Sequence, residues 1–132
     1  MTDEISEIRK QKREELMNGT TEEDEGTPKE PVHVESESHL NELTKTNDVV
    51  LVDFYADWCG PCKMLEPVVK AVAKETEAVV AKVDIDQHQL LAQQNGVRGV
   101  PTLQLYADGE VAKRMVGMQD QATLMNLVNQ FA

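Results

Sequence analysis

From residue 32 onward, the apolar positions of the chain change period repeatedly between that of a strand and that of a helix. Continuous β-prone runs are typical of strands covered on both faces, and apolar residues at three- and four-residue spacing indicate helices between them. The pattern predicts five strands and four helices. The strands are expected at Val32–Val34, Val49–Tyr55, Val79–Ile85, Leu103–Tyr106 and Val111–Val116, and the helices at Ser38–Thr46, Pro61–Glu75, about Gln87–Asn95 and about Asp120–Phe131.

Short-range signals mark where several of these elements begin and end. The serine that starts the first helix, Ser38, predicts an N-cap, and Pro61 occupies a first helical turn, where proline is tolerated. Pro67 lies inside the same helix and is expected to kink it. Asp108-Gly109 between two apolar runs predicts a hairpin. Parallel crossovers followed by an antiparallel hairpin predict an α/β fold, a central mixed five-stranded sheet flanked by four helices.

The first 31 residues differ in composition from the rest of the chain. They hold five apolar residues, against 48 among the remaining 101, and should not form a core of their own. Good helix formers at residues 3–17 predict a marginal, exposed helix, and residues 18–31 have the Gly, Thr, Pro and acidic composition of a solvated linker. We expect a charged extension at 1–31 and one domain at 32–132. The extension could dock a partner or be a tolerated, solubilising segment.

The chain carries 24 acidic and 13 basic residues, a formal net charge of -11, of which -5 lies in the extension. This excess argues against nucleic acid as a partner, because its phosphates would repel the chain. No apolar run approaches the ~18 residues of a membrane span, and the first residues lack the apolar region of a secretory signal. We therefore expect a cytoplasmic monomer with no nucleic-acid or membrane partner.

The two cysteines of the chain stand in the motif Trp58-Cys59-Gly60-Pro61-Cys62-Lys63, which follows a buried strand and opens a helix. The positive end of the helix dipole and its unpaired N–H groups should lower the pKa of the first thiol from about 8.5 toward neutrality. Two intervening residues place both sulfurs on one turn, and Gly60-Pro61 permits the tight turn. The motif predicts an exposed nucleophile at Cys59 and a more buried resolving thiol at Cys62.

Other uses of the two cysteines fit the sequence less well. A zinc site needs about four ligands, and His33, His39 and His88 lie singly in separate elements. A structural disulfide that closes so short a loop removes little entropy from the unfolded chain. A cysteine protease gives the second cysteine no role. The sequence favours a redox pair, with no metal and no bound cofactor.

Two charged residues interrupt the buried strands. Burying the carboxylate of Asp53 costs several kcal/mol unless it is neutral or paired. A raised pKa would let Asp53 accept the proton of Cys62 when that thiol attacks a mixed disulfide, whereas at a strand end or edge Asp53 would face solvent. Lys82 either lies beside Asp53 and tunes it or is an ordinary exposed lysine.

A proline-containing stretch, Gly99-Val100-Pro101-Thr102, precedes the fourth predicted strand. Proline at the start of a strand is ordinary. A cis bond between Val100 and Pro101 would instead bring a free backbone edge beside Cys59. The sequence leaves both conformations open.

The stretch from Val52 to Met64 resembles thioredoxin, whose signature is a Cys-x-x-Cys motif near a βαβ unit. Further similarities follow in the order of that family. They are Pro67, Ala81-Lys82-Val83-Asp84, Val97-Arg98-Gly99-Val100-Pro101-Thr102, Asp108-Gly109 and Val116-Gly117. The resemblance covers roughly residues 32–132 and implies the thioredoxin fold.

This resemblance implies a dithiol–disulfide oxidoreductase that reduces protein disulfides and is recharged by a separate thioredoxin reductase, either flavin-dependent or ferredoxin-linked. It implies that Cys59 attacks, that Cys62 resolves, and that Asp53 and Lys82 manage protons. Main-chain groups of Val100 would pair with an extended target segment. The target groove is implied to be lined by Trp58, Gly60, Pro61, Gly99, Val100, a cis Pro101, Gly117 and Met118.

The Gly-Pro between the cysteines is the reductase-type dipeptide of this family, whereas oxidases and isomerases of the same fold generally carry a different, often His-containing one. Tyr55 stands where Trp is frequent and Met118 where a small residue is usual, which concerns the shape of the groove. Two alternatives remain open. One is an oxidase or isomerase of the same fold, and the other is a binding module whose acidic extension docks a partner.

Overall fold

The alternating strands and helices predicted from residue 32 onward are present in the computed structural model, which describes residues 27–132. The helix predicted at 3–17 and most of the linker predicted at 18–31 lie outside the described residues. The strands are β1 (Val32–His33), β2 (Val49–Tyr55), β3 (Val79–Asp84), β4 (Thr102–Ala107) and β5 (Glu110–Val116), and the helices are α2 (Glu37–Thr46), α3 (Gly60–Glu75), α4 (Gln89–Gln94) and α5 (Gln121–Phe131). None of these described helices is long and apolar enough to cross a membrane.

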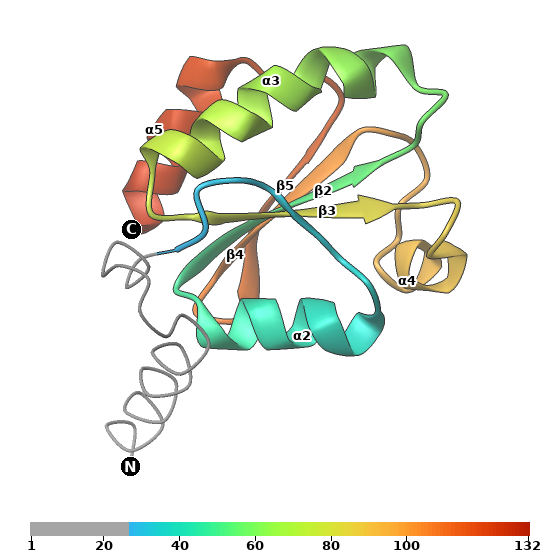
Figure 1. Ribbon diagram of the computed structural model, residues 1–132, viewed down its shortest axis with the longest axis horizontal. Coiled ribbons are helices and arrows are strands. Elements are labelled where there is room, and N and C mark those ends of the chain that lie inside the picture. Colours follow the sequence, from blue (N-terminus) through green and yellow to red (C-terminus); the bar gives the residue numbers. More distant parts are fainter. Residues whose placement is uncertain (1–26) are drawn as a thin grey trace, which may run out of the picture.

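The five strands form one mixed sheet, as the sequence predicts, and their order in it is β1-β3-β2-β4-β5. The strands β1, β3 and β2 are parallel to one another, and β4 is antiparallel to both of its neighbours. Helices α3 and α5 cover one face of the sheet, and α2 and α4 cover the other (Figure 1). The central strand β2 is therefore covered on both faces, which explains its uninterrupted apolar run.

Because side chains alternate across a strand, β2 contributes to two separate cores. Val49 and Leu51 pack with apolar residues of α3 and α5. Val50 and Val52 belong to the cluster beneath α2 and α4. By the same alternation, Asp53 points to the face that α3 covers. The period of the strand thus places a carboxyl group under the helix that carries both cysteines.

The hairpin between β4 and β5 has the two-residue turn that its sequence predicts. Asp108 (φ 54°) and Gly109 (φ 88°) both adopt positive φ, as a type I′ turn requires.

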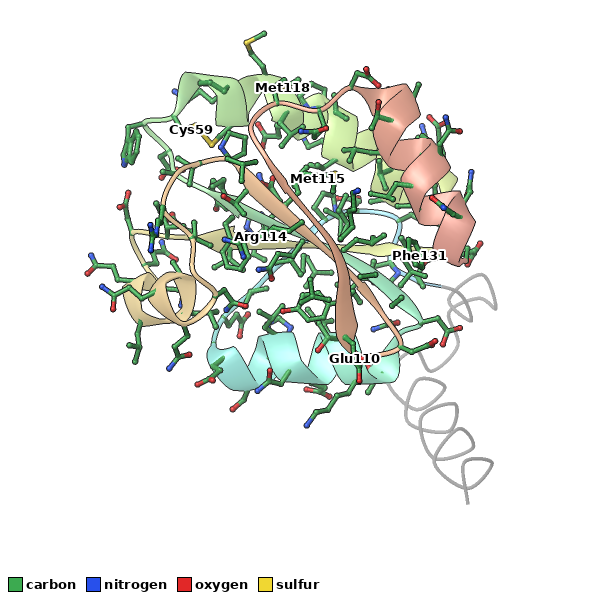
Figure 2. The ribbon with its side chains drawn as sticks, turned by 180° about the vertical axis from the view of Figure 1, so that it is seen from behind. Cys59, Glu110, Arg114, Met115, Met118 and Phe131 are labelled. Carbon is green, nitrogen blue, oxygen red and sulfur yellow. A yellow bond between two sulfur atoms is a disulfide. The ribbon has the colours of Figure 1, made fainter. Side chains whose placement is uncertain are left out.

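Farther along β5, the guanidinium of Arg114 (labelled in Figure 2) donates to the carbonyls of Asn95 and Gly96, both at 2.7 Å. These bonds satisfy carbonyls at the C-terminal end of α4, so β5 anchors the segment that leads to Pro101.

The start of α2 differs from the sequence prediction. The N-cap is Ser36, whose hydroxyl accepts a hydrogen bond from the backbone N–H of His39 at 3.1 Å. In return, Nδ1 of His39 accepts from the backbone N–H of Glu35 at 3.0 Å. Ser38, the predicted cap, lies inside the first turn. The prediction was wrong because the segment offers two serines, and only the register of the helix decides which side chain reaches an unpaired N–H.

Replacing the observed cap should destabilise the protein more than replacing the predicted one. Ser36→Ala removes the acceptor for a helix N–H and should lower the free energy of unfolding by about 1 kcal/mol. Ser38→Ala is the matched control and should change it by less than about 0.5 kcal/mol, since alanine favours a helix interior. Urea unfolding of both variants measures the difference, and equal losses would contradict the assignment of the cap.

Candidate active site

The two cysteines lie at the junction between the central strand and α3. After β2 ends, the backbone turns back so that the N–H of Cys59 donates to the carbonyl of Ala56 at 3.2 Å. Cys59 is then the N-cap of α3, and its carbonyl accepts from Lys63 N–H at 3.2 Å. Cys59 and Cys62 form a disulfide with a Cα–Cα distance of 5.2 Å. The Cys62 N–H donates to Sγ of Cys59 at 3.1 Å, so a helix N–H points at the sulfur that the sequence predicts as nucleophile.

The predicted difference in exposure between the two cysteines is wrong. Cys59 is 4% exposed and Cys62 is 5% exposed. The cause is the packing around Cys59, whose side chain contacts the cluster that includes Ala56, Ile85 and Val100. The exposed residue at this position is Trp58, at 69%. Little of the disulfide is therefore open to solvent, and the indole beside it is exposed.

The segment before β4 packs against the sulfur of Cys59. The Val100–Pro101 peptide bond is cis, and the carbonyl oxygen of Val100 lies 3.7 Å from Sγ of Cys59. The carbonyl of Pro101 accepts from Gly117 N–H at 2.8 Å, which holds the end of β5 at the same place. Met118 follows and lies at the same end of the molecule as Cys59 (Figure 2).

The predicted groove residues thus come from three segments that meet around Cys59. The first segment is the motif itself, in which Trp58 precedes the cysteines and Gly60 and Pro61 lie between them, and all three are exposed. Gly99 is exposed, and a side chain added there or at Gly60 would meet no atom within 4 Å. The surface is therefore open at both glycines.

The indole of Trp58 has a partner that sequence reasoning missed. Its Nε1–H donates to Oδ2 of Asp86 at 3.0 Å. Asp86 follows β3, 28 residues farther along the chain, and no local motif connects the two. Their juxtaposition depends on β3 lying beside β2 in the sheet. The bond orients the large exposed ring beside the disulfide.

Asp53 is buried, so the possibility that it faces solvent is wrong. The residue is 1% exposed, and its Oδ1 has no hydrogen-bond partner among the described residues. Burial disfavours the charged carboxylate and raises the pKa of Asp53 from 3.8 to about 6, against the opposing effect of Lys82 and with a further rise caused by Glu66. Asp53 can therefore exchange a proton close to neutral pH.

Lys82 is also buried, which excludes the ordinary exposed lysine. It pairs with Asp53 in the register of β3 and β2 and is 7% exposed. Its Nζ lies 3.5 Å from Oε2 of Glu66 and 4.3 Å from the ring centroid of Tyr55. Sequence reasoning missed Glu66, although its position four residues after Cys62 places both on one side of α3.

The histidines remain apart in the fold, as their positions in the sequence predict. His33 lies in β1, His39 in α2, and His88 directly before α4. Within residues 27–132, no group of three or more His, Cys, Asp or Glu side chains could hold a metal ion. The redox-active group of the site is the Cys59–Cys62 disulfide itself, which exchanges two electrons with a dithiol.

The thioredoxin family model matches residues 30–130. A thioredoxin of Chlamydia caviae is 45% identical over 100 residues, which are 75% of this chain and 97% of that protein. A thioredoxin of Mycobacterium bovis is 42% identical over 71% of this chain and 83% of that protein. Both similarities extend well beyond the Cys-x-x-Cys motif.

Solved structures agree with the sequence comparisons. A point mutant of a thioredoxin from Halobacterium salinarum superposes with a TM-score of 0.78 at 52% identity, over 86% of this chain and 96% of that one. Plasmodium falciparum thioredoxin gives a TM-score of 0.68 at 28% identity, over 76% and 99%. The fold and the paired cysteines make the protein a dithiol–disulfide oxidoreductase, and the chain belongs to the thioredoxin family.

Proposed function

We propose that this protein reduces disulfides of other proteins, with Cys59 as the attacking thiol and Cys62 as the resolving thiol. The observation that carries the proposal is the position of Cys59 as N-cap of α3, with the Cys62 N–H directed at its sulfur at 3.1 Å. A helix N-terminus stabilises negative charge, and the thiolate is the form that attacks a disulfide. The Gly60-Pro61 dipeptide favours a reductase over an oxidase or isomerase of the same fold.

In the first step, the Cys59 thiolate attacks one sulfur of a target disulfide. The target S–S bond breaks, its other sulfur leaves as a thiolate that solvent protonates, and a mixed disulfide joins Cys59 to the target. The Val100 carbonyl, 3.7 Å from Sγ of Cys59, belongs to the free backbone edge on which the target segment adds as a strand. Trp58, Gly99 and Met118 form the rim around that edge.

In the second step, the Cys62 thiol gives its proton to the Asp53 carboxylate, and its sulfur attacks that of Cys59. The mixed disulfide breaks, the second target sulfur leaves as a thiolate, and the Cys59–Cys62 disulfide forms. The target has then gained two electrons. Asp53 suits this role because it lies on the face of β2 covered by α3, and a base with a pKa near neutral can take a proton and return it.

A second protein must return two electrons to the Cys59–Cys62 disulfide after each cycle, since the described residues hold no other redox group. We assign this role to a separate flavin- or ferredoxin-linked thioredoxin reductase. Both cysteines and the groove around them come from one chain, so the proposed working state is a monomer. The cytoplasm, which keeps thiols reduced, is the compartment that suits a reductase of this kind.

We place the redox domain at residues 32–132 and treat residues 1–31 as an extension outside it. The described end of the extension lies against the C-terminal end of α3, where Lys29 Nζ is 3.5 Å from Oε2 of Glu77 and 3.2 Å from the carbonyl oxygen of Thr76. Helix α3 has 16 residues and is about 24 Å long. The contact is therefore at the opposite end of the helix from Cys59.

The two cysteines should fail in different ways when each is replaced. Cys59→Ser should lower the rate of insulin disulfide reduction by about 100-fold or more, because no thiolate remains at the helix N-terminus. Cys62→Ser should complete the first step only, so the target stays attached. Intact-mass spectrometry then shows the covalent complex, which dithiothreitol releases.

Ser38→Ala, on the far side of the sheet in α2, is the control for this pair and should reduce insulin at the wild-type rate. Wild-type turnover by Cys59→Ser would show that the assigned roles are wrong.

Asp53→Asn should stabilise the protein above neutral pH. The folded protein holds the Asp53 proton more tightly than the unfolded chain, so stability falls as pH rises from 3.8 to about 6 and is level above that. The shift in pKa corresponds to about 3 kcal/mol of lost stability above pH 6. Asp53→Asn should therefore raise the free energy of unfolding by about 3 kcal/mol at about pH 8 and change it little at about pH 4. Urea unfolding at the two pH values measures this gain.

Asp48→Asn makes the same change at an exposed aspartate just before β2. It should alter the free energy of unfolding by less than about 0.5 kcal/mol at either pH. Asp53→Asn should also slow the resolving step. A gain that is the same at both pH values would contradict the burial of an ionised carboxylate as its cause.

Removing residues 1–26 should leave disulfide reduction within about twofold of the full chain. The reason is that both cysteines, Asp53 and the residues packed around them all lie within residues 27–132. Insulin reduction by both forms, with a chemical dithiol as donor, measures the effect. A loss beyond tenfold would favour the alternative in which the extension is the functional binding element.

A further inference from the structure

Glu66 is an ionisable residue near the buried charges for which the two-step mechanism has no use. It lies on α3, one helical turn after Cys62, and its side chain is 47% exposed. Its Oε2 is 3.5 Å from the ammonium of Lys82. The ion pair thus joins a solvent-accessible carboxylate of the helix to a buried cation of the sheet.

The ammonium of Lys82 has two carboxylates within its reach, the buried Asp53 and the partly exposed Glu66. In the structure it lies beside Glu66. Asp53 and Lys82 are register partners on adjacent strands and point to the same face, so their Cβ atoms are only about 5 Å apart. A four-carbon side chain could bring the ammonium to Asp53. Instead, its ion pair within 4 Å, among the described residues, is with Glu66, and the ring of Tyr55 lies 4.3 Å away.

The consequence for Asp53 is a buried carboxyl group that forms no ion pair within 4 Å among the described residues, although the charge of Lys82 still lowers its pKa. Its Oδ1 has no hydrogen-bond partner among residues 27–132. A carboxylate paired with an ammonium is a weaker base than an unpaired one, because the charge of the partner favours the ionised form. Burial is the main cause of the raised pKa of Asp53, and the position of the ammonium decides how far that rise is offset.

We propose that Glu66 is a positioning residue for the resolving step, which holds the ammonium of Lys82 away from Asp53 while that carboxylate takes the proton of Cys62. This inference rests on the proposed function and concerns its second step only. Glu66 does not touch the target or the sulfurs in this account. It acts through Lys82.

The other groups that face Asp53 are few. The ionisable residues near Asp53 on this face are Tyr55 on β2, Lys82 and Asp84 on β3, and Cys62 and Glu66 on α3, with Asp57 and Cys59 between β2 and α3. Lys113 lies on the same face of the sheet in β5, beside Leu105 rather than Asp53. The carboxylate of Asp84 accepts from the backbone N–H groups of Asp86 and Gln87, which commits it to the loop after β3. From β4 and α5, the packing residues are apolar, among them Leu103 and Leu124. Glu66 is thus the carboxylate on this face that pairs with Lys82.

The test uses Glu66→Gln, which keeps the shape of the side chain and removes its charge. Glu75→Gln is the matched control, because it makes the same change at an exposed position near the end of the same helix. Reduced protein is mixed with a chromophoric aromatic disulfide at a series of pH values. The first thiol released reports the Cys59 step, and the second reports the resolving step.

In Glu66→Gln, the pH midpoint of the second release should move down by roughly half to one pH unit, as Lys82 turns to Asp53. Its plateau rate should fall roughly two- to fivefold, because a weaker base takes the proton. The first release should stay within about twofold of wild type, and the control should change neither. Titration of the Asp53 carboxyl carbon by NMR should show the same downward shift.

A second background separates action through Lys82 from the direct field of Glu66. Lys82→Met keeps the volume of the buried stem without its charge. In that background only the direct effect of the Glu66 charge on Asp53 remains, so Glu66→Gln should move the midpoint by less than half of the shift seen with Lys82 present. An unchanged midpoint in the single variant, or an equal shift in both backgrounds, would overturn the positioning role. Failure of the proposed function looks different, because the wild-type protein would then release no second thiol.

Discussion

The site depends on one junction, the point at which the central strand β2 turns into α3. Because β2 is buried on both faces, its end is fixed in the sheet, and the helix that follows has a defined start. Cys59 caps that start and receives the N–H of Cys62 on its sulfur. The same strand carries Asp53 under the same helix. Both cysteines and the buried carboxyl group are therefore positioned by a stretch of ten residues, and the rest of the fold holds that stretch in place.

Burying Asp53 and Lys82 in the core lowers the free energy of unfolding of the fold that holds this junction. An uncompensated carboxylate and an ammonium between strands each carry a desolvation cost. The cost of Asp53 is reduced by holding its proton up to a pKa of about 6. The cost of Lys82 is reduced by the contact with Glu66, whose carboxylate reaches water, and by the face of an aromatic ring. The two groups thus remain in the core without forming a close ion pair with each other.

The sequence was informative wherever a local pattern determined the outcome. The continuous run of β2, the Asp108-Gly109 turn and the helix after Cys59 each depend on neighbours in the chain, and all were predicted correctly. The cap of α2 was misplaced by two residues, from Ser38 to Ser36, because two nearby serines satisfy the same local rule.

What depended on sheet order could not be predicted in the same way. The bond from Trp58 to Asp86 spans 28 residues and exists only because β3 lies beside β2. The burial of Cys59 results from Val100, 41 residues away, packing against its sulfur. The pair between Glu66 and Lys82 needed both kinds of information, the helical spacing from Cys62 and the strand register with Asp53.

Tyr55 and Met118, the two residues expected to affect the shape of the groove, differ in their surroundings. Met118 is 43% exposed at the rim, where it can affect only what approaches. Tyr55 lies beneath, where its ring contacts the ammonium of Lys82 and burial raises the pKa of its hydroxyl. The cysteines and their helix N-terminus are left unchanged by both. Met118 is therefore placed where an approaching molecule would meet it, and Tyr55 is placed where it contacts a buried charge of the core.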